Sequence, residues 1–384
     1  MDHKKTYRFD TIAVHAGDLR PPIMRSVGLP IFQTSTYVYD SDDEKNAIMY
    51  HRMNNSPNHA YLGQKLAALE HSEAALVTSS GMSAITSAVL AAVGPGEHLL
   101  SQERLYGGTG YFFRDFGNYN RTVSFFSLDN LDLLPSMVTS KTKAIYIESL
   151  ENPLLRAPDF ERIVSFAKSR GLATIIDNTF PSPVNFNPID LGFDIVVHSA
   201  TKYLNGHSDI IAGAIMGTEE FISKANSVLI ITGGCLDAHS CFLLQRGLKT
   251  LGIRVRQHNY NAMKFATGLG RIKGVERVVY PGLENHPDHE LIRKYFSGFG
   301  GMLCFYLNLE PQEIDRRLHR MQLGYLAPSL GGTETLVTRP SSTSFANYSP
   351  AERKRLGLTD NLVRVSVGLE DPEDLLEDFM QALG

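Results

Sequence analysis

The sequence predicts an α/β protein with a large domain around a mainly parallel sheet and a smaller α+β domain after it. Between residues 61 and 245, short and almost uninterrupted apolar runs alternate with helix-like stretches, as buried parallel strands and crossover helices do. Beyond residue 245, one helical region precedes several strand-like runs, which is the segregated order of an α+β domain. A chain of 384 residues has the length of two ordinary domains.

Residues 1–60 form the first segment, which is rich in Pro, Asn, Tyr and His and has few apolar repeats. Such a segment is either disordered or an irregular arm that packs on another surface. At residues 61–74 the pattern changes, because Leu62, Leu66 and Leu69 have helical spacing.

The predicted large domain, residues 61–245, continues at 74–94 with a strand, a Ser-Ser-Gly turn and an apolar helix. Further strands are predicted at 97–102, 122–128, 143–149, 173–178 and 194–199, with a helix at 157–171. The C-terminal domain, residues 246–384, begins within a single long helical region predicted over 235–270. After this region, strands are expected at 277–283, 301–309 and 362–370.

Composition excludes several classes of protein. Lys and Arg number 37 against 41 Asp and Glu, a net charge of −4 that gives no reason to expect nucleic acid or an anionic membrane as a partner. No apolar run reaches the ~18 residues of a membrane helix, and the N-terminus does not resemble a secretory signal. Three cysteines without CxxC spacing fit a reduced, cytoplasmic protein.

Polar residues of chemically useful types stand where the predicted strands end, and ligands of open parallel sheets bind beyond the carboxyl ends of strands. These residues are Ser79, Ser80 and Gly81; Glu148, Ser149 and Asn152; Asp177; and Ser199, Thr201 and Lys202. Taken singly, each has an ordinary structural explanation: a Ser-Ser-Gly turn caps a helix, and a strand-terminal Asp or Lys forms a cap or an ion pair.

Together, these residues favour pyridoxal phosphate (PLP) as cofactor. Lys202 would bind its aldehyde covalently, and Asp177 would keep its pyridine nitrogen protonated. The backbone at Gly81 would approach the phosphate, because a helix N-terminus attracts anions. Tyr106, in "RLYGGTG", is a candidate to cover the ring.

Competing motifs are weak. "GLGRIKG", residues 268–274, has the wrong spacing for a dinucleotide fingerprint, and neither a Walker A sequence nor HExxH is present. "HPDHE", residues 286–290, has poor spacing for a helical metal pair, so a solvated loop is expected there and no metal.

"DIVVHSATKYLNGHSDIIAGAIMG" resembles the cofactor-lysine signature of the cysteine/methionine-metabolism family of PLP enzymes, and the resemblance extends from "PIFQTSTYVY" to "LVRVSVGLED". This family includes cystathionine γ-synthase, cystathionine γ-lyase, cystathionine β-lyase and methionine γ-lyase. The resemblance implies fold type I and a homotetramer whose active sites are shared between subunits. It also implies that residues 1–60 are an arm contacting the neighbouring subunit.

The resemblance implies roles for individual residues of this chain, because they match the positions of functional residues in the family motifs. Lys202 matches the cofactor lysine, Asp177 the partner of the pyridine nitrogen, and Tyr106 the stacked tyrosine. The phosphate donors match Gly81, Met82, Ser199 and Thr201, with Tyr50 and Arg52 reaching the neighbouring subunit's phosphate. The residues that hold the substrate match Asn152, Ser329 and Arg364, and Arg364 would clamp the α-carboxylate.

The sequence departs from the family pattern in places that bear on specificity. Pro328 stands where many cystathionine-handling members have Glu, and Gly108 where methionine γ-lyases often have Cys. "APS" and "DNLVR" are similar to plant-type γ-synthases. "YHRMNNSPN" replaces the common "YSRxGNPT", and "RPSSTSFANYS" stands where the usual "MTH" motif is expected.

These patterns favour γ-replacement on an activated homoserine with cysteine or another thiol. The alternative is γ-elimination from cystathionine or methionine, which shares the same early steps. Two other classes are weighed against these. A non-catalytic homologue is disfavoured because Lys202, Asp177, Tyr106 and Arg364 are all retained, and a nicotinamide-dependent oxidoreductase because the glycine fingerprint is missing.

Overall fold

The structure is a computed structural model that describes residues 7–38, 49–343, 345–346 and 348–384. Parts of the predicted arm, residues 1–6 and 39–48, lie outside the described residues, as do Ser344 and Asn347 of "RPSSTSFANYS". Among the described residues, every helix is too short or too polar to cross a membrane.

The larger sheet has seven strands in the order β1-β7-β6-β5-β4-β2-β3. They are β1 (Ala74–Thr78), β2 (His98–Gln102), β3 (Thr122–Phe126), β4 (Thr142–Glu148), β5 (Ala173–Asp177), β6 (Ile195–His198) and β7 (Gly213–Gly217). All pairs from β3 to β6 are parallel, and only β7 runs antiparallel to its neighbours β1 and β6. The predicted mainly parallel α/β sheet is therefore confirmed.

Both faces of this sheet are buried, which explains the continuous apolar runs. On β4, Ile145 and Ile147 belong to one hydrophobic cluster, whereas Ala144 and Tyr146 belong to the cluster on the other face. The helices around the sheet are α1 (Phe9–His15), α2 (Pro57–Glu70), α3 (Gly81–Ala92), α4 (Gly107–Arg114), α5 (Leu134–Met137), α6 (Phe160–Ser169), α7 (Ser182–Asn185) and α8 (Glu219–Thr232).

Helix α1 corrects the prediction that residues 1–60 are irregular throughout. It packs against α2 and α10 of its own chain, through an apolar side that includes Phe9, Ile12 and Ala13. The buried amine of Lys65 donates to the carbonyls of Ala13 and Val14, at 2.8 and 3.0 Å, and so satisfies the C-terminal end of the helix. One turn of apolar spacing is too short a signal to separate from an irregular segment.

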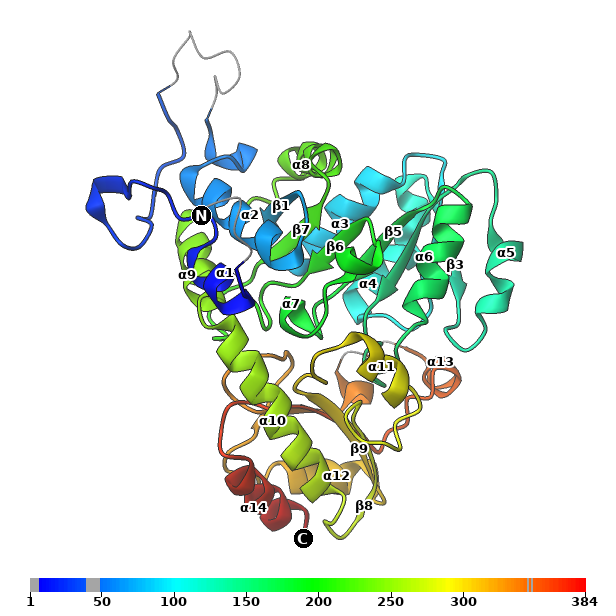
Figure 1. Cartoon of the computed structure of the whole chain (residues 1–384). Helices are drawn as coiled ribbons and strands as arrows, with labels where there is room; N and C mark the ends of the chain where they lie inside the picture. Colours follow the sequence, from blue (N-terminus) through cyan, green and yellow to red (C-terminus); the bar gives the residue numbers. More distant parts are fainter. Residues whose placement is uncertain (1–6, 39–48, 344, 347) are drawn as a thin grey trace.

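The predicted single helix over 235–270 is in fact two helices, α9 (Ala238–Leu248) and α10 (Leu251–Leu269). They separate because the carbonyl of Gly247 accepts from the N–H of Thr250, at 3.2 Å, and from the guanidinium of Arg254, at 2.7 Å. In Figure 1, α10 runs from the region of α9 along the second sheet towards α14.

The second sheet has the order β10-β11-β12-β9-β8. Its strands are β8 (Val275–Val279), β9 (Met302–Leu307), β10 (Tyr325–Leu326), β11 (Leu336–Thr338) and β12 (Leu362–Ser366). The helices of this part are α11 (His289–Tyr295), α12 (Pro311–Leu318), α13 (Pro350–Arg355) and α14 (Pro372–Leu383). Strands and helices are thus both present after α10, as expected for an α+β region.

Candidate active site

The carboxyl ends of the parallel strands β4, β5 and β6 open onto a cavity of about 760 Å³. The predicted site residues that line it are Gly81, Met82, Tyr106, Asn152, Asp177, Ser199, Thr201, Lys202, Ser329 and Arg364. They come from both sheets, since Arg364 lies on β12 of the second sheet. The fold therefore brings together residues that are up to 283 positions apart between Gly81 and Arg364.

Lys202 lies in the turn after β6, with most of its side chain removed from solvent. Its Nζ donates to the Ser329 hydroxyl at 2.5 Å. Burial, reinforced by the positive charge of Arg364, lowers the pKa of Lys202 to about 8. A larger fraction of this amine is therefore uncharged near neutral pH than for an ordinary lysine, which suits a nucleophile or a base.

Asp177 ends β5 and is buried at the floor of the cavity. Thr179 donates twice to Oδ1 of this carboxylate, from its backbone N–H at 3.0 Å and its hydroxyl at 2.5 Å. Burial raises the pKa of Asp177, and the two bonds from Thr179 oppose that shift. Because both bonds go to Oδ1, Oδ2 keeps the capacity to accept from a ligand N–H.

Thr179 itself was not among the predicted site residues. Its hydroxyl oxygen also accepts the backbone N–H of Ser199 at 2.8 Å, so it joins the loop after β5 to the loop after β6. The sequence signal for it is modest: a hydroxyl residue two positions after a strand-terminal Asp is typical of a local side-chain turn.

Gly81 is the first residue of α3, and a Cβ built on it would lie 2.7 Å from the Cβ of Ser199. Only glycine therefore allows the backbone to approach Ser199 this closely. The preceding Ser80 acts as the N-cap, since its Oγ accepts from the N–H of Ser83 at 3.0 Å. The Thr201 hydroxyl exchanges hydrogen bonds with the backbone of Ala212, at 3.1 and 3.0 Å.

Arg364 is buried and held at two points beside the cavity. One guanidinium nitrogen donates to Asn152 Oδ1 at 3.1 Å, and another donates to the carbonyl of Ser329 at 3.3 Å. Ser329 has φ +102°, a region that non-glycine residues rarely occupy, at a cost of about 1–3 kcal/mol. This backbone conformation lets Ser329 contact Arg364 through its carbonyl and Lys202 through its hydroxyl.

Tyr106 is the N-cap of α4, and its side chain is 47 % exposed at the cavity. Its N–H donates to Oε1 of Glu148 at 2.6 Å. Glu148 ends β4 and lines the cavity, although it was noted in the sequence only as a polar strand end. Burial, and then the charge of Asp177, raises the pKa of Glu148.

Tyr50 and Arg52 do not reach the cavity of their own chain. Both are exposed, and the guanidinium of Arg52 donates to the carbonyl of Ile230 on α8 at 3.1 Å. The segment 286–290 is only in part the solvated loop that is expected from the sequence. Pro287 and Glu290 are exposed, but His286 is 5 % exposed, Asp288 forms an ion pair with Arg156, and His289 begins α11. Within the described ranges, His, Cys, Asp and Glu side chains nowhere gather into a group of three or more suited to a metal.

The residues around the cavity fit PLP. A lysine amine of lowered pKa, a buried carboxylate with an acceptor oxygen to spare and a glycine at a helix N-terminus meet in one space. Each matches one part of the cofactor: the aldehyde, the pyridine nitrogen and the phosphate.

Comparison with known proteins agrees with this chemistry. The family model "Cys/Met metabolism PLP-dependent enzyme" matches residues 10–384. The chain is 38 % identical to an L-methionine gamma-lyase of Fusobacterium nucleatum subsp. polymorphum, with 100 % of this chain and 99 % of that protein covered. It is 36 % identical to a cystathionine gamma-lyase of Dictyostelium discoideum, again over 100 % and 99 %.

Among solved structures, a cystathionine gamma synthase from Xanthomonas oryzae pv. oryzae, in complex with aminoacrylate and cysteine, superposes with a TM-score of 0.94. It is 34 % identical and covers 99 % of this chain and 98 % of its own. This likeness over the whole length confirms the expected fold type I architecture. The chain belongs to the family of PLP-dependent enzymes of cysteine and methionine metabolism.

Proposed function

We propose that this enzyme catalyses γ-replacement, in which cysteine or another thiol displaces the leaving group of an activated homoserine. Its family carries out PLP-dependent lyase or synthase reactions on small molecules. The observation that carries the choice is the cavity wall at Pro328 and Ser329, next to Arg364. These residues belong to "APS" and "DNLVR", the two segments similar to plant-type γ-synthases.

The size of the cavity fits a small-molecule site. Such sites typically occupy ~300–1,000 Å³, and this one has a volume of about 760 Å³.

When bound, PLP withdraws electrons from the amino acid and so makes its α- and β-hydrogens acidic. Arg364, oriented by Asn152, would hold the α-carboxylate in bidentate fashion. Lys202 would remove the α-proton at Nζ, aided by its lowered pKa. Tyr106 would exchange a proton near the γ-leaving group, and Asp177 would keep the ring nitrogen protonated.

The second candidate is γ-elimination, which is favoured by the names of relatives. Proteins that are 38 % and 36 % identical to this chain are called methionine gamma-lyase and cystathionine gamma-lyase. Both reactions need the same base and the same carboxylate clamp, so they differ in whether a thiol or water completes the turnover.

We further propose that the chain forms a homotetramer with shared active sites and that the segment 1–60 is its intersubunit arm. The exposure of Tyr50 and Arg52, away from the cavity of their own chain, supports this assignment. Their side chains would complete the phosphate site of a neighbouring subunit. Residues 61–245 would form the PLP-binding domain and residues 246–384 the C-terminal domain.

Two measurements test the function. The yellow colour of lysine-bound PLP should be present in the native protein and lost in Lys202→Ala; a native protein that takes up no PLP would overturn the cofactor assignment.

In the second measurement, products are analysed from O-acylated or O-phosphorylated homoserine with cysteine, and from cystathionine or methionine alone. If only the latter two react, giving keto acid and no thioether, the enzyme is a lyase and the replacement proposal is wrong.

A further inference from the structure

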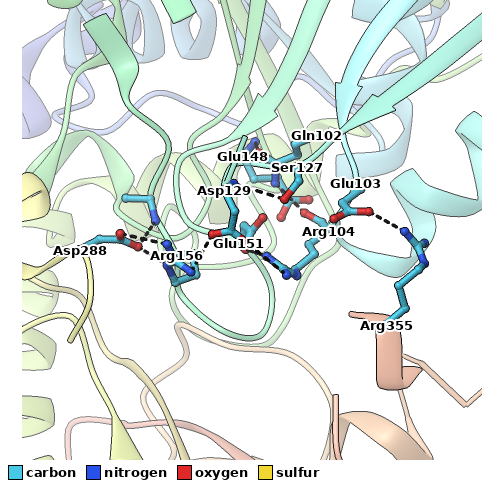
Figure 2. Close-up of polar contacts among 11 residues, drawn as sticks. Gln102, Glu103, Arg104, Ser127, Asp129, Glu148, Glu151, Arg156, Asp288 and Arg355 are labelled. Atoms are coloured by element: carbon cyan, nitrogen blue, oxygen red, sulfur yellow. Dashed lines mark hydrogen bonds and ion pairs between the residues drawn. The ribbon is translucent and has the colours of Figure 1, made fainter. Parts of the chain in front are cut away.

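A buried ion pair, Arg104–Glu151, lies beside the active-site cavity (Figure 2). A guanidinium nitrogen of Arg104 is 3.2 Å from Oε2 of Glu151, whose side chain is 0 % exposed, and Arg104 is 14 % exposed. Neither residue lines the cavity. The function proposed above therefore gives this pair no chemical role.

Each member of the pair belongs to a loop that carries a candidate site residue. Arg104 stands two positions before Tyr106, and Glu151 directly precedes Asn152. The ion pair therefore joins the loop after β2, which carries the candidate ring-covering side chain, to the loop after β4, which orients Arg364.

Further hydrogen bonds connect the ends of β2 and β4 with the loop after β2. The Gln102 side chain donates to the carbonyl of Arg104 at 2.6 Å and accepts the N–H of Glu148 at 2.9 Å. Glu148 in turn accepts the N–H of Tyr106 at 2.6 Å. Figure 2 shows Gln102, Glu148, Arg104 and Glu151 gathered where strands end.

Further ion pairs connect the Arg104–Glu151 pair to the C-terminal part of the chain. Asp129 approaches Arg104 at 3.6 Å and Arg156 at 3.1 Å. Arg156 also pairs with Asp288, just before α11, at 2.6 Å. The loop that contains Asn152 is thus fixed from both sides.

The energetics favour a role in geometry over one in stability. Oε1 of Glu151 and Nε of Arg104 have no hydrogen-bond partner among the described residues. Burial raises the pKa of Glu151 to about 7, although Arg104 and Arg156 oppose the shift. A buried ion pair with incomplete hydrogen bonding adds little net stability compared with apolar residues of similar volume, so stability alone does not account for it.

We propose that Arg104 and Glu151 are positioning residues, which set the distance between Tyr106 and the Asn152–Arg364 carboxylate clamp. This inference rests on the proposed roles of Tyr106, Asn152 and Arg364 in the reaction. Removing the pair would let the two loops shift relative to each other, and displacements of about 1 Å can cost up to ~100-fold in rate.

The test uses the holoenzyme with Glu151→Gln, Arg104→Met and the apolar double variant Arg104→Met/Glu151→Leu. The matched control is Arg355→Ala, which breaks the more exposed pair between Arg355 and Glu103 on the same loop. Hydrogen–deuterium exchange is followed in segments 103–111 and 148–157. The dissociation constant of glycine, which has a carboxylate but no leaving group, is measured from the cofactor absorbance.

The double variant is expected to melt within a few degrees of the native enzyme, to exchange faster in both segments and to bind glycine about tenfold more weakly. Its kcat should fall by roughly 10- to 100-fold, while Arg355→Ala stays native in every measurement. Native exchange and glycine affinity in the double variant would overturn the inference. So would equal losses in Arg355→Ala, or a collapse of thermal stability that accounts for the lost affinity. Absence of turnover in the native enzyme would refute the proposed function instead. The glycine dissociation constants would then still test whether Arg104 and Glu151 position the carboxylate clamp.

Discussion

At the residue scale, Thr179 offers a direct test of how the cofactor site is held. Thr179→Val removes the hydroxyl that donates to Asp177 and accepts from the N–H of Ser199. Losing these bonds costs about 1–3 kcal/mol, so the dissociation constant of PLP should rise roughly 10- to 100-fold in equilibrium titration.

Thr174→Val is the matched control for this change. The Thr174 hydroxyl makes the same two kinds of bond with Asp194, both at 2.8 Å, but Thr174 does not line the cavity. The Thr174→Val variant should have a lower thermal stability than the native protein, and its affinity for PLP should stay near native. Equal loss of affinity in both variants would show that Thr179 acts through general stability alone.

Lys202 gives a pH-dependent prediction. Only the uncharged amine attacks an aldehyde, and the pKa of Lys202 is lowered from 10.5 to about 8. The rate of PLP uptake by the apoprotein should therefore rise with pH through about 8 and then level off. An ordinary lysine would continue to gain rate up to about 10.4.

The contribution of Arg364 to the lowered pKa of Lys202 can be tested by substitution. Because the positive charge of Arg364 disfavours protonation of Lys202, Arg364→Met should move the midpoint of the uptake profile to higher pH. The titration is repeated with pyridoxal, which lacks the phosphate. This control distinguishes the ionisation of Lys202 from the ionisation of the phosphate group. A midpoint near 10 in the native protein, or one that does not respond to Arg364→Met, would contradict the assignment.

At the scale of elements, the sequence predicts the large sheet well because its strands are buried on both faces. Continuous apolar runs predict the strands β2 to β6. The polar residues at the ends of these runs indicate Asp177 and Lys202 as candidate site residues. The strand β7, "GAIMG", is not predicted by this pattern. Its first residue, Gly213, is required by close packing, because a Cβ there would lie 2.2 Å from the carbonyl oxygen of Ser80. The break between α9 and α10 is also not predicted, since it depends on the bonds that Thr250 and Arg254 donate to the carbonyl of Gly247.

Arg254 of α10 should therefore be important for stability. It is 5 % exposed and donates to the carbonyls of Tyr203 and Gly247, at 2.8 and 2.7 Å. Arg254→Met removes both bonds and leaves the Tyr203 carbonyl without this donor, whereas Gly247 keeps its bond from the N–H of Thr250. At a cost of about 3 kcal/mol, the variant should lower the melting temperature by roughly 4 °C. Arg256→Met on the same helix breaks only an exposed pair with Asp10, so a similar loss there would refute this account.

At the scale of the whole molecule, a single chain brings Asp177, Lys202 and Arg364 together in one cavity, whereas Tyr50 and Arg52 lie away from that cavity. The sequence predicts both groups of candidate site residues, because each residue matches a position of the family motifs. The resemblance also implies that Tyr50 and Arg52 serve a neighbouring subunit. What composition and periodicity could not predict is the contact of Arg52 with α8, because it depends on tertiary packing.

Complementation between subunits tests whether Arg52 serves a neighbour. Arg52→Ala and Lys202→Ala should each lose most activity alone, the first through weak phosphate binding and the second through loss of the base. When the two variants are unfolded and refolded together, each mixed pair gains one site with a native Lys202 and a native Arg52 from the partner. Activity should therefore return on mixing. If Arg52 acted within its own subunit, every site would keep one defect, and mixed samples would stay at the level of the separate variants.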